Sequence, residues 1–225
     1  MQMAFQLSCV RLALLALVLA SLCVSTRAGT IQGGPAQSAA HIIGIVTDSD
    51  GGRIANVEID FTGVQGRRRT TTTDKGSYTI DLAPGVYAAE IASSNFCRLR
   101  RGKFLATSTS EIKIDFQLWV CASDASYNFV ELDSVKNTDL RPLVLYGSVR
   151  QAGDKQIFTG ATMGRIYPVV FTFNLLTVEA DELTYDRTEH VITARGNVSW
   201  QDGKASDSAL QLSVKLDGLK PRLLP

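Results

Sequence analysis

The stretch IIGIVTDSDGGRIANVEIDF, residues 42–61, decides the fold class, because two runs of alternating apolar residues flank a polar, glycine-rich segment. Alternation with a period of two places successive side chains on opposite faces of a β-strand. The Asp-Ser-Asp-Gly-Gly sequence at 48–52 supplies residues that tolerate the backbone conformations of a tight turn. The stretch therefore predicts two strands joined by a turn.

The same alternation continues over most of the chain, and no segment keeps the period of a helix. Clusters of Gly, Asp and Thr recur between the runs, at the spacing of an antiparallel all-β fold. We predict a first β-sandwich unit at 42–120, a connector at 121–140 and a short jelly-roll-like antiparallel unit at 141–218. The expected strands are 42–47, 54–62, 68–73, 77–82, 86–92, 97–106, 111–120, 143–150, 155–161, 167–179, 181–186, 190–201 and 208–216.

The N-terminus carries the features of a secretory signal peptide. Arg11 precedes an apolar run at 12–24, and the Thr-Arg-Ala sequence at 26–28 offers small residues at the −3 and −1 positions of a cleavage site. The run is shorter than the ~20 residues that a membrane-spanning helix needs. We therefore predict a signal peptide at 1–28 and a flexible leader at 29–41, with a retained membrane anchor as the alternative.

Charge and cysteine content narrow the class of protein. The formal net charge of +1 becomes −1 once Arg11 and Arg27 leave with the signal peptide. A near-neutral chain has no overall electrostatic attraction for nucleic acid, so we expect no nucleic-acid partner. Two of the 4 cysteines also leave, which places Cys97 and Cys121 in what the signal peptide implies is an oxidising compartment.

Glycine, aspartate and aromatic residues recur at fixed places in the first unit. They are Gly44, Val46, Asp48, Gly52, Ile54, Ala55, Val57, Ile59, Thr73, Asp74, Gly76, Tyr78, Ile80, Leu82, Pro84, Gly85, Tyr87, Asn95 and Phe96. With this pattern the unit resembles the carboxypeptidase regulatory-like domain, a transthyretin-like or prealbumin-like β-sandwich. The resemblance implies a non-catalytic appendage, and some relatives of this fold bind carbohydrate.

Cys97 and Cys121 fall opposite each other in an expected hairpin. Its strands, 97–106 and 111–120, are separated by a Thr-Ser-Thr-Ser sequence, which is typical of a turn. Gly102 would mark a bulge in the first of these strands. We predict a disulfide between the two cysteines, which would stabilise the fold by about 3 kcal/mol in the chain-entropy model.

Six arginines form two local clusters in an otherwise near-neutral chain. A guanidinium matches the geometry of phosphate and carboxylate groups, so the clusters are candidates for contact with an anionic envelope polymer or a lipid phosphate. The alternative is a charged sheet edge that prevents edge-to-edge aggregation. The candidate residues are Arg67, Arg68, Arg69, Arg98, Arg100 and Arg101.

A second pattern of apolar and turn residues lies in the second unit. It consists of Ala180, Asp181, Leu183, Tyr185, Asp186, Val191, Ile192, Ala194, Gly196, Asn197, Val198, Asp202 and Gly203. In this pattern the chain at about 140–216 is similar to the repeat of the organic-solvent-tolerance family, which includes the periplasmic bridge protein of lipopolysaccharide transport. The resemblance implies stacked hairpins in an open β-jelly roll whose apolar interior holds acyl chains.

A groove for an acyl chain needs an apolar strand face that is open at one edge. Each methylene buried there would contribute about 0.8 kcal/mol. Apolar alternation alone does not separate such a groove from a sealed core, so both interpretations stay open. The candidate groove residues are Val169, Phe171, Phe173, Leu183, Tyr185, Val191, Val198, Trp200, Leu210 and Leu212.

Nothing in the sequence predicts catalysis, a cofactor or a metal. His41 lies in the leader and His190 in a hairpin turn, and no Cys/His spacing matches a zinc site. A calcium loop that begins at Asp48 would have Ile59 at its twelfth position, where Glu is required. No nucleophile elbow, phosphate loop or dinucleotide fingerprint occurs.

These features favour a non-enzymatic protein that is secreted across the inner membrane and is periplasmic or outer-membrane-associated. Its expected partner is lipopolysaccharide or another envelope lipid, bound in the second unit. The alternative is an accessory module that binds carbohydrate or an envelope protein, with the second unit as scaffold. An open apolar groove would favour the first hypothesis, and a closed core would favour the second.

Overall fold

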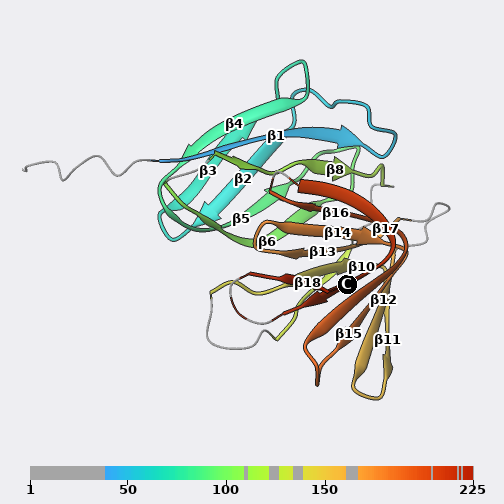
Figure 1. Ribbon diagram of the computed structural model, residues 1–225. Helices are drawn as coiled ribbons and strands as arrows, with labels where there is room; N and C mark the ends of the chain where they lie inside the picture. The colour runs from blue at the N-terminus through green and yellow to red at the C-terminus, as the bar shows by residue number, and fades with distance from the viewer. Residues whose placement is uncertain are drawn as a thin grey trace, which may run out of the picture. The chain divides into compact units, whose positions relative to one another are not determined.

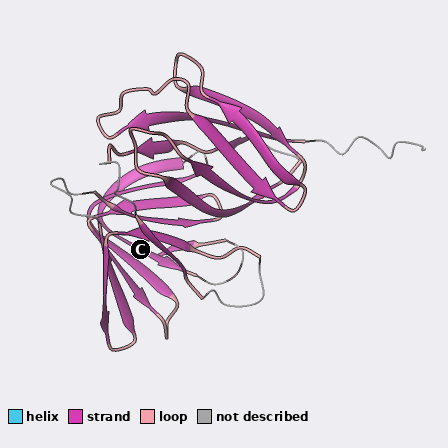
Figure 2. Ribbon diagram, turned by 180° about the vertical axis from the view of Figure 1, so that it is seen from behind, coloured by secondary structure: helices cyan, strands magenta, loops and turns pink. Residues whose placement is uncertain are grey.

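The computed structural model describes residues 39–108, 111–121, 127–133, 139–160, 167–203, 205–216, 218 and 220–224. Every regular element in these ranges is a β-strand (Figure 2), so the prediction of an all-β fold is confirmed. In the described part of the chain, no helix is long and apolar enough to cross a membrane. The predicted signal peptide and the leader up to residue 38 lie outside the described residues.

The first unit is a sandwich of two sheets (Figure 1). One sheet has the order β3-β2-β5-β6, and in the other β1 lies between β4 and the consecutive strands β7 and β8. The strands are β1 (Ala40–Asp48), β2 (Glu58–Gly63), β3 (Gly66–Thr71), β4 (Ser77–Leu82), β5 (Gly85–Ile91), β6 (Leu99–Ala106), β7 (Glu111–Lys113) and β8 (Phe116–Leu118).

An aromatic core fills the space between the two sheets. Phe61 and Phe104 are both 0% exposed, and their rings meet nearly at right angles with centroids 6.3 Å apart. The Tyr78 hydroxyl donates a hydrogen bond to the Ile114 carbonyl at 2.6 Å, which satisfies a buried polar group. Gly44 is required beside this bond, because a Cβ there would lie 1.8 Å from the same carbonyl oxygen.

The chain after β6 does not return along β6. It crosses to the other sheet as β7 and β8, which both pair parallel with β1. The prediction of a hairpin from 97–106 and 111–120 is therefore wrong, since alternation marks a strand without naming its partner. The predicted bulge at Gly102 is confirmed, but it lies in the β5–β6 pair, where the register shifts between Tyr87 and Ala89.

The disulfide between Cys97 and Cys121 is present, as predicted, although the hairpin is not. A short antiparallel contact replaces it, in which Phe96 bridges to Val120 and the Cys97 N–H donates to the Trp119 carbonyl at 2.8 Å. This contact holds the two cysteine Cα atoms 4.9 Å apart. Because Phe96 is opposite Val120, Cys97 is opposite Trp119 rather than Cys121, so the predicted register is wrong although the predicted disulfide is present.

The second unit is a 10-stranded antiparallel sheet. One of its strands lies in the predicted connector, and the predicted strand 167–179 is a hairpin of two strands that turns at Asn174, whose φ is 53°. The strands are β9 (Asn128–Glu131), β10 (Leu143–Tyr146), β11 (Ser148–Ala152), β12 (Lys155–Thr159), β13 (Val169–Phe173), β14 (Leu176–Ala180), β15 (Glu182–Asp186), β16 (Val191–Asp202), β17 (Ala205–Lys215) and β18 (Arg222–Leu224).

The sheet bends where β14 and β15 follow each other along β16, and β16 and β17 curve from one half of the sheet to the other (Figure 1). Gly196 and Asn197 form a bulge in β16 with φ values of 70° and 42°. Asp181 holds this bulge: its N–H donates to the Gly196 carbonyl at 2.9 Å, and its carboxylate accepts from the Asn197 amide at 2.9 Å. A Cβ on Gly196 would lie 2.4 Å from that carboxylate, so the bend requires glycine.

The bend closes one face of the sheet around a second core, to which both halves of the sheet contribute. Its innermost side chains are 0–2% exposed. They include Leu132, Leu140, Val144, Phe158, Val169, Phe171, Phe173, Leu176, Val178, Ala180, Leu183, Tyr185, Ile192, Ala194, Val198, Val214 and Leu216.

The other face of the same sheet packs on the sandwich. Leu143, Leu145 and Val170 belong to the core of the first unit. The Gly102 N–H, freed by the bulge in β6, donates to Thr172 Oγ1 of β13 at 2.9 Å. The sandwich and the bent sheet therefore belong to one compact body, residues 37–225.

Candidate functional site

The structure places most of the predicted groove residues in the sealed second core. Val169, Phe171, Phe173, Leu183, Tyr185 and Val198 are 0–2% exposed. Val191 is not among them, because its neighbour Ile192 occupies the inward position of β16. Trp200 and Leu212 are partly buried against the same core, and Leu210 is 90% exposed. The sequence left open whether these residues line an acyl-chain groove or form a sealed core, and the structure shows a sealed core.

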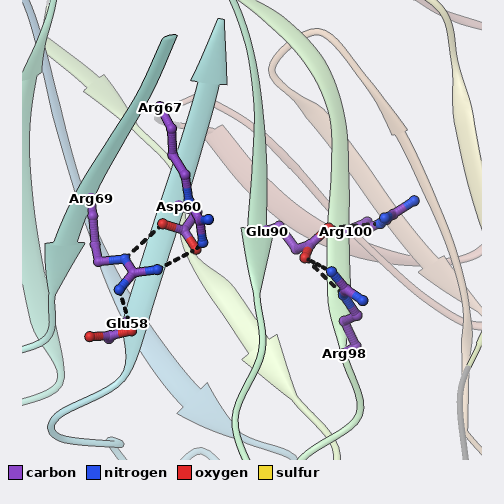
Figure 3. A network of polar contacts seen from close by, with 7 residues as sticks. All are labelled: Glu58, Asp60, Arg67, Arg69, Glu90, Arg98 and Arg100. Atoms are coloured by element: carbon purple, nitrogen blue, oxygen red, sulfur yellow. Dashed lines mark hydrogen bonds and ion pairs between the residues drawn. The ribbon is translucent and has the colours of Figure 1, made fainter.

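The first arginine cluster forms ion pairs within the sandwich (Figure 3). Arg67 and Arg69 both contact Asp60, with Arg69 Nε 2.8 Å from Asp60 Oδ1, and Arg69 also lies 2.9 Å from Glu58. Hydrogen bonds from Arg67 and then Arg69 hold the pKa of Asp60 well below its usual value. Arg68 is exposed on β3.

The second cluster is organised around Glu90 (Figure 3). Arg98 Nε and Arg100 Nε each lie 2.8 Å from its carboxylate, and Arg100 also stacks 4.5 Å above the Phe129 ring. Burial would raise the pKa of Glu90, but the hydrogen bonds from the two arginines outweigh it and lower this pKa. Because their carboxylate partners are on neighbouring strands, these arginines favour the charged-edge interpretation.

A polar cavity of about 440 Å³ lies between the outer faces of two sheets, that of β1, β7 and β8 and that of β14, β16 and β17. Opposite residues of an antiparallel pair share a face, and here Glu179 is opposite Ser199 and Thr177 is opposite Gln201. The polar residues that line the cavity include Thr47, Lys113, Asp115, Gln117, Thr177, Glu179, Ser199, Gln201, Ser206 and Ser208.

Trp200 borders this cavity, but its ring does not face it. Trp200 is opposite Val178 in the β14–β16 pair, and Val178 is 0% exposed in the second core. The two side chains therefore share the core face of the sheet. The cavity is a site for hydrogen bonding rather than for stacking on an aromatic ring.

Asp115 anchors the sandwich side of the cavity. One carboxylate oxygen accepts from the Ile45 N–H at 3.0 Å. The other lies 2.9 Å from Lys113 Nζ and 3.3 Å from the Gln201 amide nitrogen, which comes from the second unit. These contacts fix a lysine, a carboxylate and an amide next to one another, so donors and acceptors alternate along the cavity wall.

Glu179, on the opposite wall of the cavity, carries a carboxyl group that is a weaker acid than usual. Burial raises its pKa to about 7. No described residue forms an ion pair with this carboxyl, and burial alone accounts for the shift of its pKa. At neutral pH the group therefore populates both protonation states, and it can donate as well as accept a hydrogen bond.

Sequence reasoning missed all of these residues. Lys113, Asp115 and Glu179 are polar positions between buried ones, and such positions normally face solvent. The signal that could have found them is the pairing of the strands, which the sequence does not provide. Among the described residues, no cluster of His, Cys, Asp and Glu could hold a metal ion.

A family model matches the first unit. Residues 41–118 match the carboxypeptidase regulatory-like domain, which confirms that part of the resemblance. A search of curated proteins finds no match to the chain. The similarity of the second unit to the organic-solvent-tolerance repeat stays a prediction.

Several solved structures are distantly similar to this chain. Catechol 1,2-dioxygenase of an Acinetobacter species is 9% identical, with a TM-score of 0.32 over 40% of this chain and 55% of that enzyme. A DUF3823 family protein of Bacteroides ovatus is 13% identical, with a TM-score of 0.31 over 80% of this chain and 100% of the other. A Bacteroides uniformis protein proposed to bind carbohydrate is 12% identical, with a TM-score of 0.33 over 78% of this chain and 98% of the other.

The chain spans between 55% and 61% of the length of the three dioxygenases it resembles. At these TM-scores the similarities give no information about function.

Proposed function

We propose that the protein is a non-enzymatic accessory protein of the cell envelope that binds carbohydrate in the polar cavity between its two units. The observation that carries this proposal is the lining of the cavity, in which hydroxyl, amide, carboxyl and ammonium groups converge from both units. The volume of about 440 Å³ lies within the range of roughly 300–1,000 Å³ that is usual for small-molecule sites.

A saccharide suits this lining better than an apolar ligand does. Its hydroxyl groups each donate and accept hydrogen bonds, and so do the groups of Ser199, Ser208 and Gln201 that face the cavity. An apolar ligand would leave these polar groups without partners, at a cost of roughly 1–3 kcal/mol for each one that it buries. The chemistry of the wall therefore selects a ligand rich in hydroxyl groups.

The lipid hypothesis has less support. A groove for an acyl chain would need Phe171, Leu183 and Val198 at an open surface, and each is no more than 1% exposed. A lipid would have to open the second core before it could bind there. Native mass spectrometry of protein purified from envelopes tests this hypothesis directly, because a retained lipid would appear as a defined mass increment.

Export to the cell envelope is part of the proposal. The disulfide between Cys97 and Cys121 supports it, since disulfides persist in oxidising compartments such as the periplasm. The apolar run at 12–24, with Arg11 before it, supports it independently. Fractionation of the producing cells, with detection of the chain in the periplasm or the outer membrane, is the corresponding test.

Isothermal titration calorimetry against a panel of oligosaccharides tests the binding proposal. Ser208→Trp would place a large side chain in the cavity, and we expect it to abolish saccharide binding. Ser148→Trp is the matched control, because Ser148 is an exposed strand residue outside the cavity. Equal binding by both variants, or no binding of any saccharide by the unmodified protein, would refute the proposal.

A further inference from the structure

The polar cavity continues into a small void at its deep end. The void has a volume of about 20 Å³, and it shares Asp115, Thr177 and Glu179 with the larger cavity. Its far wall includes Arg101 of β6 and Thr172 of β13. A ligand in the cavity can therefore extend a small group toward Arg101.

Arg101 is a buried cation that forms no ion pair with a carboxylate in the described part of the chain, although the more distant Asp202 attracts it electrostatically. The residue is only 5% exposed. Its guanidinium donates to Thr177 Oγ1 and to the Asn174 carbonyl at 2.9 Å. The buried Nε atom has no hydrogen-bond partner. Its Nε–H is therefore a buried donor that lacks an acceptor.

The charge of Arg101, buried without an ion pair, destabilises the folded protein when no ligand is bound. Removing an ion from water costs several kcal/mol unless a counter-charge and hydrogen bonds compensate. Burial lowers the pKa of Arg101 to about 10, so the group still carries its charge at neutral pH. Neutral acceptors, a hydroxyl and a carbonyl, compensate only part of that charge. A ligand that brings a negative charge would complete the compensation.

Strand alternation separates Arg101 from its neighbours in the sequence. Arg100 lies on the outer face of β6, where it holds Glu90 and stacks on Phe129. Arg101 turns inward to contact the β13–β14 hairpin. Both arginines line the void, but Arg100 already pairs with Glu90, so Arg101 is the one that lacks an ion pair.

We propose that the saccharide bound in the cavity is acidic, and that its carboxylate enters the void and pairs with Arg101. This proposal rests on the carbohydrate-binding function proposed above. The void of about 20 Å³ has room for little more than one water molecule, so it would take a single carboxylate oxygen of the ligand. A planar carboxylate also matches the flat guanidinium fork, whereas tetrahedral sulfate and phosphate are larger.

The neighbouring carboxyl groups allow this arrangement. Asp115 already pairs with Lys113, so its charge is balanced within the wall. Glu179 lies on both the cavity and the void, and burial raises its pKa to about 7. A protonated Glu179 does not repel an incoming carboxylate and can donate a hydrogen bond to it.

The test compares oligogalacturonate with its methyl ester, which has the same ring and linkage but no charge, by calorimetry on the full chain. We expect the unmodified protein to bind the acid about 30-fold more tightly or better. Arg101→Met should reduce affinity for the acid to that for the ester. Arg68→Met removes the same charge at an exposed position outside the cavity and should keep the preference.

The outcomes separate the two proposals. Equal affinity of the unmodified protein for acid and ester would overturn the acidic-saccharide proposal and leave carbohydrate binding intact. Binding of neither compound, nor of any other saccharide, would overturn both. Loss of the preference in Lys113→Met but not in Arg101→Met would assign the carboxylate to Lys113 and overturn the role of Arg101. If Arg101→Met does not fold, Lys113→Met decides the question: a kept preference for the acid supports Arg101, and a lost preference overturns its role.

Discussion

The two faces of the bent sheet have opposite characters along β14. Val178 and Glu179 are neighbours in β14, yet Val178 is 0% exposed in the second core, whereas Glu179 lines the polar cavity. The bend seals the inner face, and the sandwich covers the outer face incompletely. Apolar alternation therefore locates a core, whereas the proposed binding site lies on the face that alternation assigns to solvent.

The largest expected effect is a loss of stability when a side chain of the sealed inner face is truncated. Phe171→Ala removes a ring that is 0% exposed, and we expect a loss of about 3–5 kcal/mol in the free energy of unfolding. Urea denaturation measures it. Gln201→Ala, on the cavity face, should change stability much less and should weaken saccharide binding instead. A small effect of Phe171→Ala would mean that the inner face is open, as the lipid hypothesis requires.

The next effect concerns Glu179 and depends on pH. Its pKa is about 7 in the folded protein and near 4.5 when unfolded, so the folded state binds more protons between these values. Stability should therefore fall as pH rises from about 4.5 to about 7, by up to about 3 kcal/mol. Glu179→Gln should remove this component in urea denaturation at a series of pH values. An unchanged pH profile would show that the cavity wall is hydrated at Glu179.

The smallest expected effect is that of a substitution outside both faces, at the charged edge formed by Glu90, Arg98 and Arg100. The pKa of Glu90 is lowered by Arg98 and Arg100 against the effect of burial, so its contribution is present above pH ~4.5 and is lost as pH falls below it. Glu90→Gln should destabilise the protein by no more than about 1 kcal/mol at pH 7, because such pairs are partly exposed. Its saccharide affinity should match that of the unmodified protein. Weaker binding would place the site on the arginine edge instead.

Much of the fold could be predicted from the sequence, because strands and turns are local. The apolar alternation and turn residues of 42–61 predict β1, the turn after it and β2 correctly. Strand partners are not local, so the parallel crossing of β7 and β8 to β1 was missed. The disulfide was nevertheless predicted, although the register behind it was wrong: the observed pairing of Phe96 with Val120 still holds Cys97 and Cys121 close enough to bond.

The candidate site could not be predicted for the same reason. Lys113, Glu179, Gln201 and Ser208 come from four strands, and no spacing in the sequence connects them. The candidate groove residues were chosen by apolar alternation, which finds core positions. The polar cavity lies on the opposite face of the same strands. The sequence does not reveal it until the strand order and the bend at Gly196 are known.

Amide chemical-shift mapping by nuclear magnetic resonance, during titration with an oligosaccharide that binds, tests the central claim most directly. We predict that the perturbed amides cluster at Lys113, Thr177, Gln201 and Ser208, around the polar cavity. Amides near Tyr185 and His190, which line a separate cavity of about 340 Å³, should not change. Perturbations confined to that second cavity or to the arginine edge would contradict the assignment of the binding site to the outer face of the bent sheet.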